Sequence, residues 1–150
     1  MQKKVNVMYF DQFEQNQVFE LKPVHITKEL MLSFAKVYDP NKLHMDEKFG
    51  KTTRYGQIIA PGVMCFMLVW AQFIRQDIFG EQFGGALSTS IEWHHPVFAG
   101  DTLTSTATVT EKTQRNKYNG LIEITYDVYN QHGVHVMTDV TRSVILRDVK

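Results

Sequence analysis

The chain has 150 residues, with 16 basic and 16 acidic side chains and a formal net charge of zero at pH 7. This length is enough for one self-sufficient hydrophobic core, so we predict a single domain over residues 1–150. The charge balance provides no bulk electrostatic attraction for nucleic acid or for an acidic membrane, and we expect neither as a partner.

Two further features bear on the class of protein. The single cysteine, Cys65, excludes an intrachain disulfide, and its place in an apolar stretch predicts a buried side chain. Residues 1–7 contain two lysines but no apolar stretch behind them, so we predict no secretory signal and a cytoplasmic location. The uncharged stretch 55–74 is interrupted by glycine, proline and glutamine, and we interpret it as core and not as a membrane span.

The first predicted element is a helix that begins after Thr27 and ends at Asp39. Thr27 suits the N-cap position, and Ile26 and Met31 are spaced for a hydrophobic staple around it. Apolar residues then recur at helical spacing, namely Leu30, Phe34, Val37 and Tyr38. Because a residue before proline is disfavoured in the α conformation, the helix ends at Asp39, before Pro40. Asp39 thus lies at the end of a rigid element, where functional side chains are common.

His44 follows Asp39 by five residues, and together they form a candidate acid–base pair. In such a pair one group takes a proton from water while the other delivers or orients one. The spacing alone arises often by chance, so its weight depends on the segment that follows. Asp46 is interpreted instead as the cap of a short helix over residues 45–50.

A long apolar helix is predicted over residues 61–79. Pro61 suits its first position, and Gly80, with Gly84 and Gly85 beyond it, is expected to end it. A helix amino end presents unpaired backbone N–H groups and the positive end of the helix dipole. The sequence therefore predicts a proton-transfer pair and an oxyanion-stabilising helix end, which begins at Gly62, within one short segment.

From Ala86 onward the apolar period changes from that of a helix to that of a strand. The first candidate strand covers residues 87–93. The faces expected to be buried in the next three are formed by Leu103, Ser105, Ala107 and Val109; by Ile122, Ile124, Tyr126 and Val128; and by Val134, Val136, Val140, Val144 and Leu146. A sheet with one apolar face must bury it, and the 61–79 helix is the most apolar partner available. We predict an α+β fold, with an antiparallel sheet wrapped around one long central helix.

Several segments carry a resemblance to a known family, namely residues 9–14 with 17–19, 39–47, 59–62 and 96–103. They are similar to the MaoC-like, (R)-specific enoyl-CoA hydratase branch of the hot-dog fold. This resemblance implies reversible addition of water to a trans-2-enoyl thioester of coenzyme A or acyl carrier protein, giving an (R)-3-hydroxyacyl thioester. It implies that Asp39 and His44 activate the water and that the Gly62 N–H holds the thioester oxygen. It also implies a homodimer or higher homo-oligomer, and no cofactor apart from the carrier of the substrate.

Three positions depart from the family pattern. Lys42 replaces a usual proline, Pro61 a usual histidine, and Trp70 a residue that is often small and hydroxylated. The Trp70 indole is expected to reshape the acyl pocket, shortening it or favouring a polar or branched acyl group. The candidates for substrate binding are Asn41, Lys42, Arg54, Ala60, Pro61, Trp70, Trp93 and His95. Lys42 and Arg54 suit phosphate, and solvated surface charge is an equal alternative for both.

Two other functions stay open. A hot-dog acyl-CoA thioesterase would use Asp39 to direct water at the thioester carbonyl, and a non-catalytic acyl-CoA-binding domain would keep the pocket without turnover. The spacing of Asp39 and His44 favours the hydratase over both, although the fold alone decides nothing. We expect no metal site at Glu92, His94 and His95, because adjacent side chains of a strand point to opposite faces.

Overall fold

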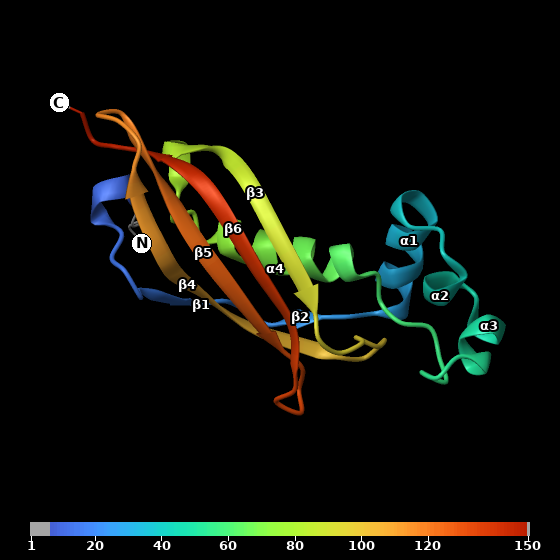
Figure 1. Ribbon diagram of the computed structural model, residues 1–150. Coiled ribbons are helices and arrows are strands. Elements are labelled where there is room, and N and C mark those ends of the chain that lie inside the picture. Colours follow the sequence, from blue (N-terminus) through green and yellow to red (C-terminus); the bar gives the residue numbers. More distant parts are fainter. Residues whose placement is uncertain (1–6, 150) are drawn as a thin grey trace, which may run out of the picture.

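The computed structural model describes residues 7–149, which form one antiparallel sheet and four α-helices (Figure 1). The strands are β1 (Val18–Glu20), β2 (Val24–His25), β3 (Phe83–Trp93), β4 (Thr102–Gln114), β5 (Asn119–Tyr129) and β6 (His135–Leu146). The helices are α1 (Lys28–Tyr38), α2 (Lys42–Met45), α3 (Glu47–Thr52) and α4 (Gly62–Arg75), with short 3₁₀ turns η1 (Phe10–Gln12) and η2 (Gly80–Gln82). Residues 1–6, where no secretory signal was predicted, lie outside the described residues.

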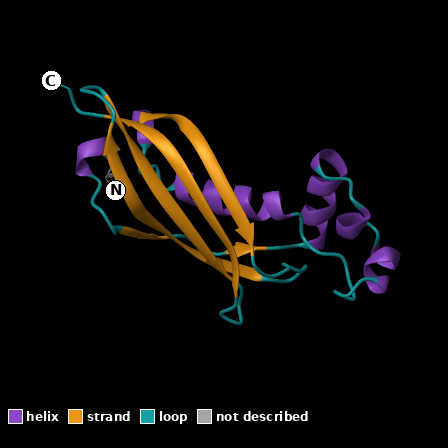
Figure 2. Cartoon of the chain, in the orientation of Figure 1, coloured by secondary structure: helices purple, strands orange, loops and turns teal. Residues whose placement is uncertain are grey.

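The sheet has the strand order β1-β4-β5-β6-β3, every neighbouring pair is antiparallel, and β2 pairs with β4. The helix α4 lies across one face of this sheet, while α1, α2 and α3 gather beyond one end of it, next to the amino end of α4 (Figures 1 and 2). This arrangement confirms the predicted α+β hot-dog fold.

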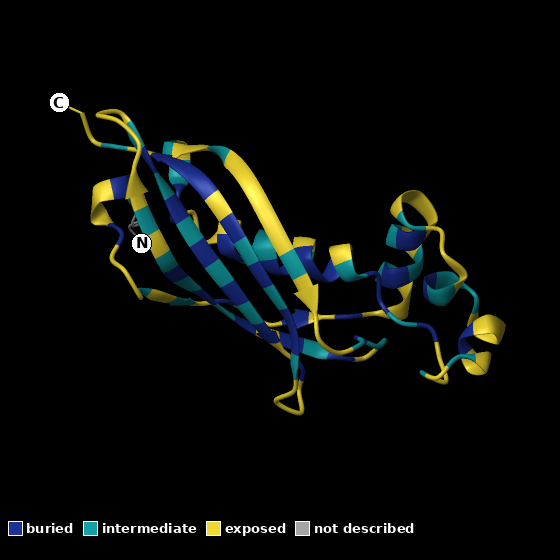
Figure 3. Cartoon of the chain, viewed as in Figure 1, coloured by how far each residue is buried: buried dark blue, intermediate teal, exposed yellow. Residues whose placement is uncertain are grey.

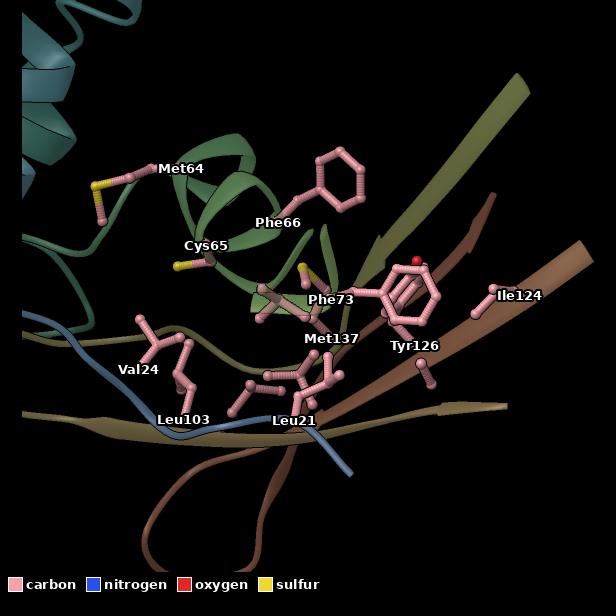
Figure 4. Close-up of a cluster of buried hydrophobic side chains, with 14 of the residues drawn as sticks. Leu21, Val24, Met64, Cys65, Phe66, Phe73, Leu103, Ile124, Tyr126 and Met137 are labelled. Atoms are coloured by element: carbon pink, nitrogen blue, oxygen red, sulfur yellow. The ribbon is translucent and has the colours of Figure 1, made fainter. Parts of the chain in front are cut away.

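The hydrophobic core lies between α4 and the sheet (Figure 4). Phe73 of α4 meets Tyr126 of β5 edge-on, with ring centroids 5.7 Å apart. The predicted inner faces of β4 and β5 are confirmed, because the alternating residues Leu103, Ser105, Ala107 and Val109 and Ile122, Ile124, Tyr126 and Val128 are buried. Each large apolar side chain buried in this way contributes about 1.5–3 kcal/mol.

The predicted inner face of β6 is wrong in its middle. The residues paired with Ile122, Ile124 and Tyr126 are Ser143, Thr141 and Asp139, so three polar side chains of β6 share the face that α4 covers. Val136 and Val144 are buried as expected, but Val134 and Leu146 are exposed and Val140 is only half-buried. The alternating valines predict the wrong core face here, because Asp139, Thr141 and Ser143 occupy the side of β6 that faces the core.

Asp139 is fully buried and accepts hydrogen bonds from two hydroxyl groups. Thr141 Oγ1 donates to its Oδ2 at 2.5 Å, and Thr89 Oγ1 on β3 donates to its Oδ1. Burial raises the pKa of the Asp139 carboxyl, because removal from water penalises its charged form, and the two hydroxyl bonds partly oppose that change. The Tyr126 hydroxyl on the neighbouring strand is buried without a partner in the described part of the chain.

The long apolar helix is shorter than predicted. It ends at Arg75, and Asp77 then adopts a positive φ of 55° in the turn that follows. Ile78 and Phe79 are buried after this turn, so the apolar pattern continues although the helix does not. Gly84 and Gly85, which were expected beyond the helix, lie inside β3, where the register with β6 shifts.

The N-cap predictions at Thr27 and Asp46 are confirmed. Thr27 Oγ1 accepts from the Leu30 N–H at 3.1 Å, and Asp46 Oδ1 accepts from the Phe49 N–H at 3.0 Å. The short helix predicted over residues 45–50 is instead the pair α2 and α3, which meet at Asp46. The buried face of α1 consists of Met31 and Ala35, whereas Val37 and Tyr38, expected on that face, are exposed.

Candidate active site

The carboxyl end of α1 and the short helix α2 place Asp39 and His44 side by side. Asp39 is the first residue after α1, and its N–H still donates to the Ala35 carbonyl at 2.9 Å. The Asn41 side chain accepts from the Leu43 N–H at 3.0 Å and caps α2, which carries His44. The tight turn between the two helices therefore directs His44 back towards Asp39.

The two side chains are in direct contact. Asp39 Oδ2 and His44 Nε2 are 3.1 Å apart, and His44 Nδ1 is 2.8 Å from the Ile59 carbonyl oxygen. Because a carbonyl only accepts, Nδ1 carries a proton. The contact between Nε2 and Oδ2 is then a hydrogen bond only if a second proton lies between them. Nε2 of His44 and Oδ2 of Asp39 are therefore the two atoms of the pair that are placed to exchange a proton.

The two groups differ in their access to water. The His44 side chain is 11% exposed and held at both ring nitrogens, whereas the Asp39 side chain is 45% exposed. His44 is thus a fixed, nearly buried group, and Asp39 is the member of the pair that a water molecule or ligand reaches first.

The amino end of α4 has no side-chain cap. Its N-cap residue is Pro61, which has no side-chain acceptor, and the first carbonyl bond of the helix runs from the Cys65 N–H to the Pro61 oxygen at 3.2 Å. The first backbone N–H groups of α4, that of Gly62 included, are therefore left without a side-chain acceptor, at the positive end of the helix dipole.

The segment between α3 and α4 joins the pair to this helix end. The Ile59 N–H donates to the Leu43 carbonyl at 3.1 Å, while the Ile59 carbonyl accepts from His44. One residue later the Ala60 N–H donates to the Val97 carbonyl at 2.7 Å, in the loop that follows β3. Three separate parts of the chain therefore meet at residues 59–60.

A cavity of about 540 Å³ opens between these parts. It brings together seven of the residues predicted from the sequence, namely Asp39, His44, Arg54, Ala60, Gly62, Trp93 and His95. Asp39, His44 and the uncapped helix end thus face one cavity, which has room for a small organic ligand.

Four other predicted residues do not line this cavity. Asn41 uses its side chain to cap α2, Lys42 is an exposed residue of the same helix, and Pro61 is the N-cap of α4. Trp70 is partly buried against the core, with its ring centroid 6.1 Å from that of Tyr126 and 6.2 Å from those of Phe66 and Phe83. Of the two indoles, Trp93 and not Trp70 reaches the cavity.

Sequence reasoning missed several lining residues, among them Tyr55, Val63 and His94. The Tyr55 hydroxyl accepts from Arg54 Nη2 at 2.7 Å, and the guanidinium lies 4.9 Å from the ring centroid, so the two form one unit at the cavity wall. His94 Nε2 is 2.9 Å from Thr138 Oγ1. Tyr55 and His94 could have been suggested only by their position next to Arg54 and Trp93 in the sequence. Adjacency in sequence does not determine whether a side chain points into the cavity.

Cys65 also lines the cavity, but it is unsuited to nucleophilic chemistry. Burial, with a smaller contribution from the Asp101 charge, raises the pKa of its thiol to about 12. A thiol with that pKa is protonated at neutral pH, and the thiolate is the reactive form. Among residues 7–149, no three His, Cys, Asp or Glu side chains gather in a way that would hold a metal ion. None of the helices described there has the length and hydropathy needed to cross a membrane.

Comparison with known proteins gives consistent matches. Residues 16–139 match the family model described as "FAS1-like, dehydratase domain region". The chain is 27% identical over 130 residues to YdeM of Bacillus subtilis strain 168, an uncharacterised protein, with 86% of this chain and 92% of YdeM covered.

Two solved structures are similar over almost the whole chain. A monoamine oxidase regulatory protein from Archaeoglobus fulgidus superimposes with a TM-score of 0.89 and 26% identity, covering 96% of this chain and 97% of that one. The (R)-hydratase PhaJ1 from Pseudomonas aeruginosa superimposes with a TM-score of 0.75 and 25% identity, covering 94% of this chain and 86% of that one.

Proposed function

Because the chain belongs to the FAS1-like dehydratase domain region family, we propose that it adds water reversibly to a trans-2-enoyl thioester to give an (R)-3-hydroxyacyl thioester. The observation that carries the proposal is the 3.1 Å contact between Asp39 and His44 in one cavity with the uncapped amino end of α4. Proton transfer and stabilisation of a developing oxyanion are the two things that this reaction requires.

In the proposed reaction the oxygen of water bonds to C3 while C2 gains a proton. The electrons of the C2–C3 double bond move towards the thioester oxygen, which develops enolate charge. The Gly62 N–H donates to that oxygen, and the charge forms at the positive end of the α4 dipole. Asp39 and His44 take a proton from the water and deliver a proton to C2, so the pair ends the cycle with the protons it began with.

The hydrogen bond from His44 Nδ1 to the Ile59 carbonyl supports this assignment of roles. It holds the imidazole in one orientation, with Nε2 towards Asp39. A fixed tautomer is needed for an imidazole that must exchange a proton at one chosen nitrogen. Asp39, which is the more exposed, is placed to meet the water.

We propose that Arg54, with Tyr55 beside it, meets the phosphate of the pantetheine arm. That phosphate is common to coenzyme A and to carrier-protein thioesters, and guanidinium groups bind phosphate through paired N–H donors. Arg54 is exposed at the cavity wall, and its contacts with Tyr55 leave further N–H groups free to donate. Lys42 lies outside the cavity and is not included. A cytoplasmic location is the setting in which such substrates occur, and it stays a prediction.

A homodimer is also part of the proposal. In the described part of the chain, β3 pairs with β6 on one side only. All residues of β3 except Gly85 and Ile91 are exposed (Figure 3). Leu87 is 60% exposed on this edge strand, and Val63 and Met67 are exposed on α4. A long unpaired edge without lysine or proline is suited to pairing with a second sheet. The expected mass in solution, measured by analytical ultracentrifugation, is twice that of the chain.

The test is a hydration assay with trans-2-butenoyl-CoA, in which loss of the enoyl absorbance and release of free thiol are followed together. We expect the enoyl absorbance to fall without thiol release, and the product to be the (R)-3-hydroxy isomer. Asp39→Asn should lower kcat by about 10²–10⁴-fold, as expected for a general acid–base group. Asp46→Asn is the matched control, because Asp46 is a nearby carboxylate that caps α3 and does not line the cavity.

Three outcomes of this assay would contradict the proposed function or the role of Asp39. Thiol release abolished in Asp39→Asn would replace the hydratase by a thioesterase. Binding of the thioester without change in either signal would replace it by an acyl-CoA-binding domain. Equal losses in Asp39→Asn and Asp46→Asn would contradict the catalytic role of Asp39 and indicate a general effect on the helical cluster.

A further inference from the structure

The indole of Trp93 lies directly against the first residue of α4. A Cβ built on Gly62 would be only 2.5 Å from Trp93 Nε1 and 2.8 Å from Cζ2, so no side chain fits at this position while the indole is present. Trp93 is the last residue of β3, and it is 51% exposed towards the cavity that contains Asp39 and His44. A thioester whose oxygen reaches the Gly62 N–H must therefore lie beside this ring.

Residues of the helix α4 and the strand β3 meet at two places, which mark the ends of a seam between the two elements. Gly62 contacts Trp93 at one end of the seam, and Trp70 lies 6.2 Å from Phe83, ring centroid to ring centroid, at the other. Phe66, drawn in Figure 4, is between them on α4 and is 6.2 Å from Trp70. An acyl chain that continued inwards from the reacting carbons would enter this seam, and Trp93 stands at its entrance.

The seam behind Trp93 is unsuited to an apolar chain. Trp93, Ile91 and Thr89 share one face of β3, because side chains two apart on a strand point the same way. Their partners on β6 are Met137, Asp139 and Thr141, whose side chains are buried on the core side of the sheet. The buried carboxyl and the two hydroxyl groups bonded to it therefore line the side of the seam opposite α4. Methylene groups pushed against them would separate polar groups from their partners.

We infer that Trp93 limits the acyl group to a short chain, so that the substrate is the thioester of a short trans-2-enoic acid. This inference rests on the proposed hydratase function and adds the class of acyl group to it. Trp93 acts as the wall that the end of the acyl group meets, and the polar cluster on β3 and β6 excludes longer chains behind it. The sequence led us to expect this role at Trp70, which packs away from the cavity.

The test compares trans-2-butenoyl-CoA with trans-2-octenoyl-CoA as substrates for the full chain and for Trp93→Ala. We expect the wild type to favour the shorter substrate in kcat/KM by at least about tenfold. Trp93→Ala should shift the ratio of the two kcat/KM values towards the longer substrate by about 10²-fold, because the four extra methylene groups would fill the space that the indole leaves, in front of the polar cluster, and each contributes about fourfold when buried. Trp70→Ala is the matched control, since it also removes one indole and should leave the ratio unchanged.

Circular dichroism and thermal unfolding establish that each variant is folded, and Trp93→Leu replaces Trp93→Ala if the alanine variant is not. A wild type that hydrates the longer substrate equally well, or a ratio that Trp93 variants do not move, overturns the inference and leaves the hydratase function intact. A ratio that Trp70→Ala moves equally also overturns it, since an indole of the core would then set the limit. A wild type that hydrates neither substrate overturns the hydratase function itself, and the inference with it.

Discussion

The amino ends of α1 and α4 differ in how they satisfy their first backbone N–H groups. At α1 the Thr27 hydroxyl accepts from the Leu30 N–H, and side chains cap α2 and α3 in the same way. At α4 the N-cap residue is Pro61, which offers no acceptor. The capped ends serve the stability of the fold, whereas the uncapped end leaves donors for a ligand at the cavity.

The two helices also contribute to the cavity from opposite ends. The helix α1 presents Asp39 at its carboxyl end, where the chain leaves the helix, and α4 presents Gly62 at its amino end. A cap is worth about 1 kcal/mol, which α4 forgoes. Among the four α-helices described, the one amino end without a side-chain cap is the one that shares a cavity with Asp39 and His44.

Gly62→Ala is expected to have the largest effect on this comparison. The new methyl group would collide with the Trp93 indole and displace either the ring or the helix end. Loss of one aligned oxyanion donor costs about 10²–10³-fold in kcat, and we expect a loss in that range in the hydration assay. The double variant Gly62→Ala with Trp93→Ala makes room for the methyl group and should recover part of the activity. If the losses in kcat of the two single variants add up in the double variant, the clash between the methyl group and the indole is not the cause of the loss in Gly62→Ala.

Pro61→Ser adds to α4 the cap that α1 has. A serine hydroxyl at this position accepts from an N–H group of the first turn, so we expect about 1 kcal/mol more stability. In the proposed reaction the same hydroxyl would compete with the thioester oxygen for donors, and we expect kcat to fall by about tenfold. Urea unfolding and the hydration assay measure the two effects. Greater stability with unchanged kcat would show that the absence of a cap at the amino end of α4 does not contribute to catalysis.

Thr27→Ala removes the cap of α1 and is the reverse experiment. It should lower the free energy of unfolding by about 1 kcal/mol, because the Leu30 N–H loses its acceptor. Thr27 does not line the cavity, so the kinetic constants of the folded enzyme should stay as in the wild type. A fall in kcat with unchanged stability would contradict the comparison, because the capped end of α1 would then serve activity and not stability.

Asp139→Asn extends the comparison to two carboxylates and is expected to have the smallest effect. Asp139 is fully buried, whereas the Asp39 side chain is 45% exposed. Burial raises the pKa of the Asp139 carboxyl. The folded protein then binds this proton more tightly than the unfolded chain, so the free energy of unfolding falls as the pH rises from the ordinary Asp pKa, about 3.9, through the raised value.

In Asp139→Asn that part of the pH dependence should disappear, and the variant should be more stable than the wild type at neutral pH, because it no longer buries a charged carboxylate. Urea unfolding at pH 4 and at pH 7 gives both quantities. A variant that is less stable than the wild type at pH 7, with the slope unchanged, would mean that the hydroxyl bonds of Thr89 and Thr141 outweigh the burial of charge.

Local patterns predicted the parts of the fold that depend on neighbours in sequence. Thr27, Asp39 before Pro40, and Asp46 define helix ends through contacts within a few residues, and all three are found as predicted. The boundary at Arg75 was missed because Ile78 and Phe79 continue the apolar pattern through a turn. Apolar periodicity reports burial and does not by itself report where a helix ends.

Long-range contacts account for the remaining errors. In β6 the valine pattern favoured one face, but pairing with β5 turns Asp139 and Thr141 to the core side, and that pairing is not visible in β6 alone. Likewise two tryptophans were candidates for the pocket wall. Trp93 reaches Gly62 because β3 returns along α4, a contact between residues 31 positions apart that no local pattern specifies.

The hydrogen bonds at Ile59 and Ala60 have a consequence for how the protein loses activity on heating. They connect α2 and the loop after β3 through a segment of irregular backbone, so one local opening would release His44 and loosen the amino end of α4 together. Such openings have lower free energies than global unfolding. We therefore expect inactivation to precede the melting of the sheet, and amide hydrogen exchange at Ile59 and Ala60 to rise at the same temperature as activity falls. The enzyme would then switch off as a unit while most of its structure is still intact.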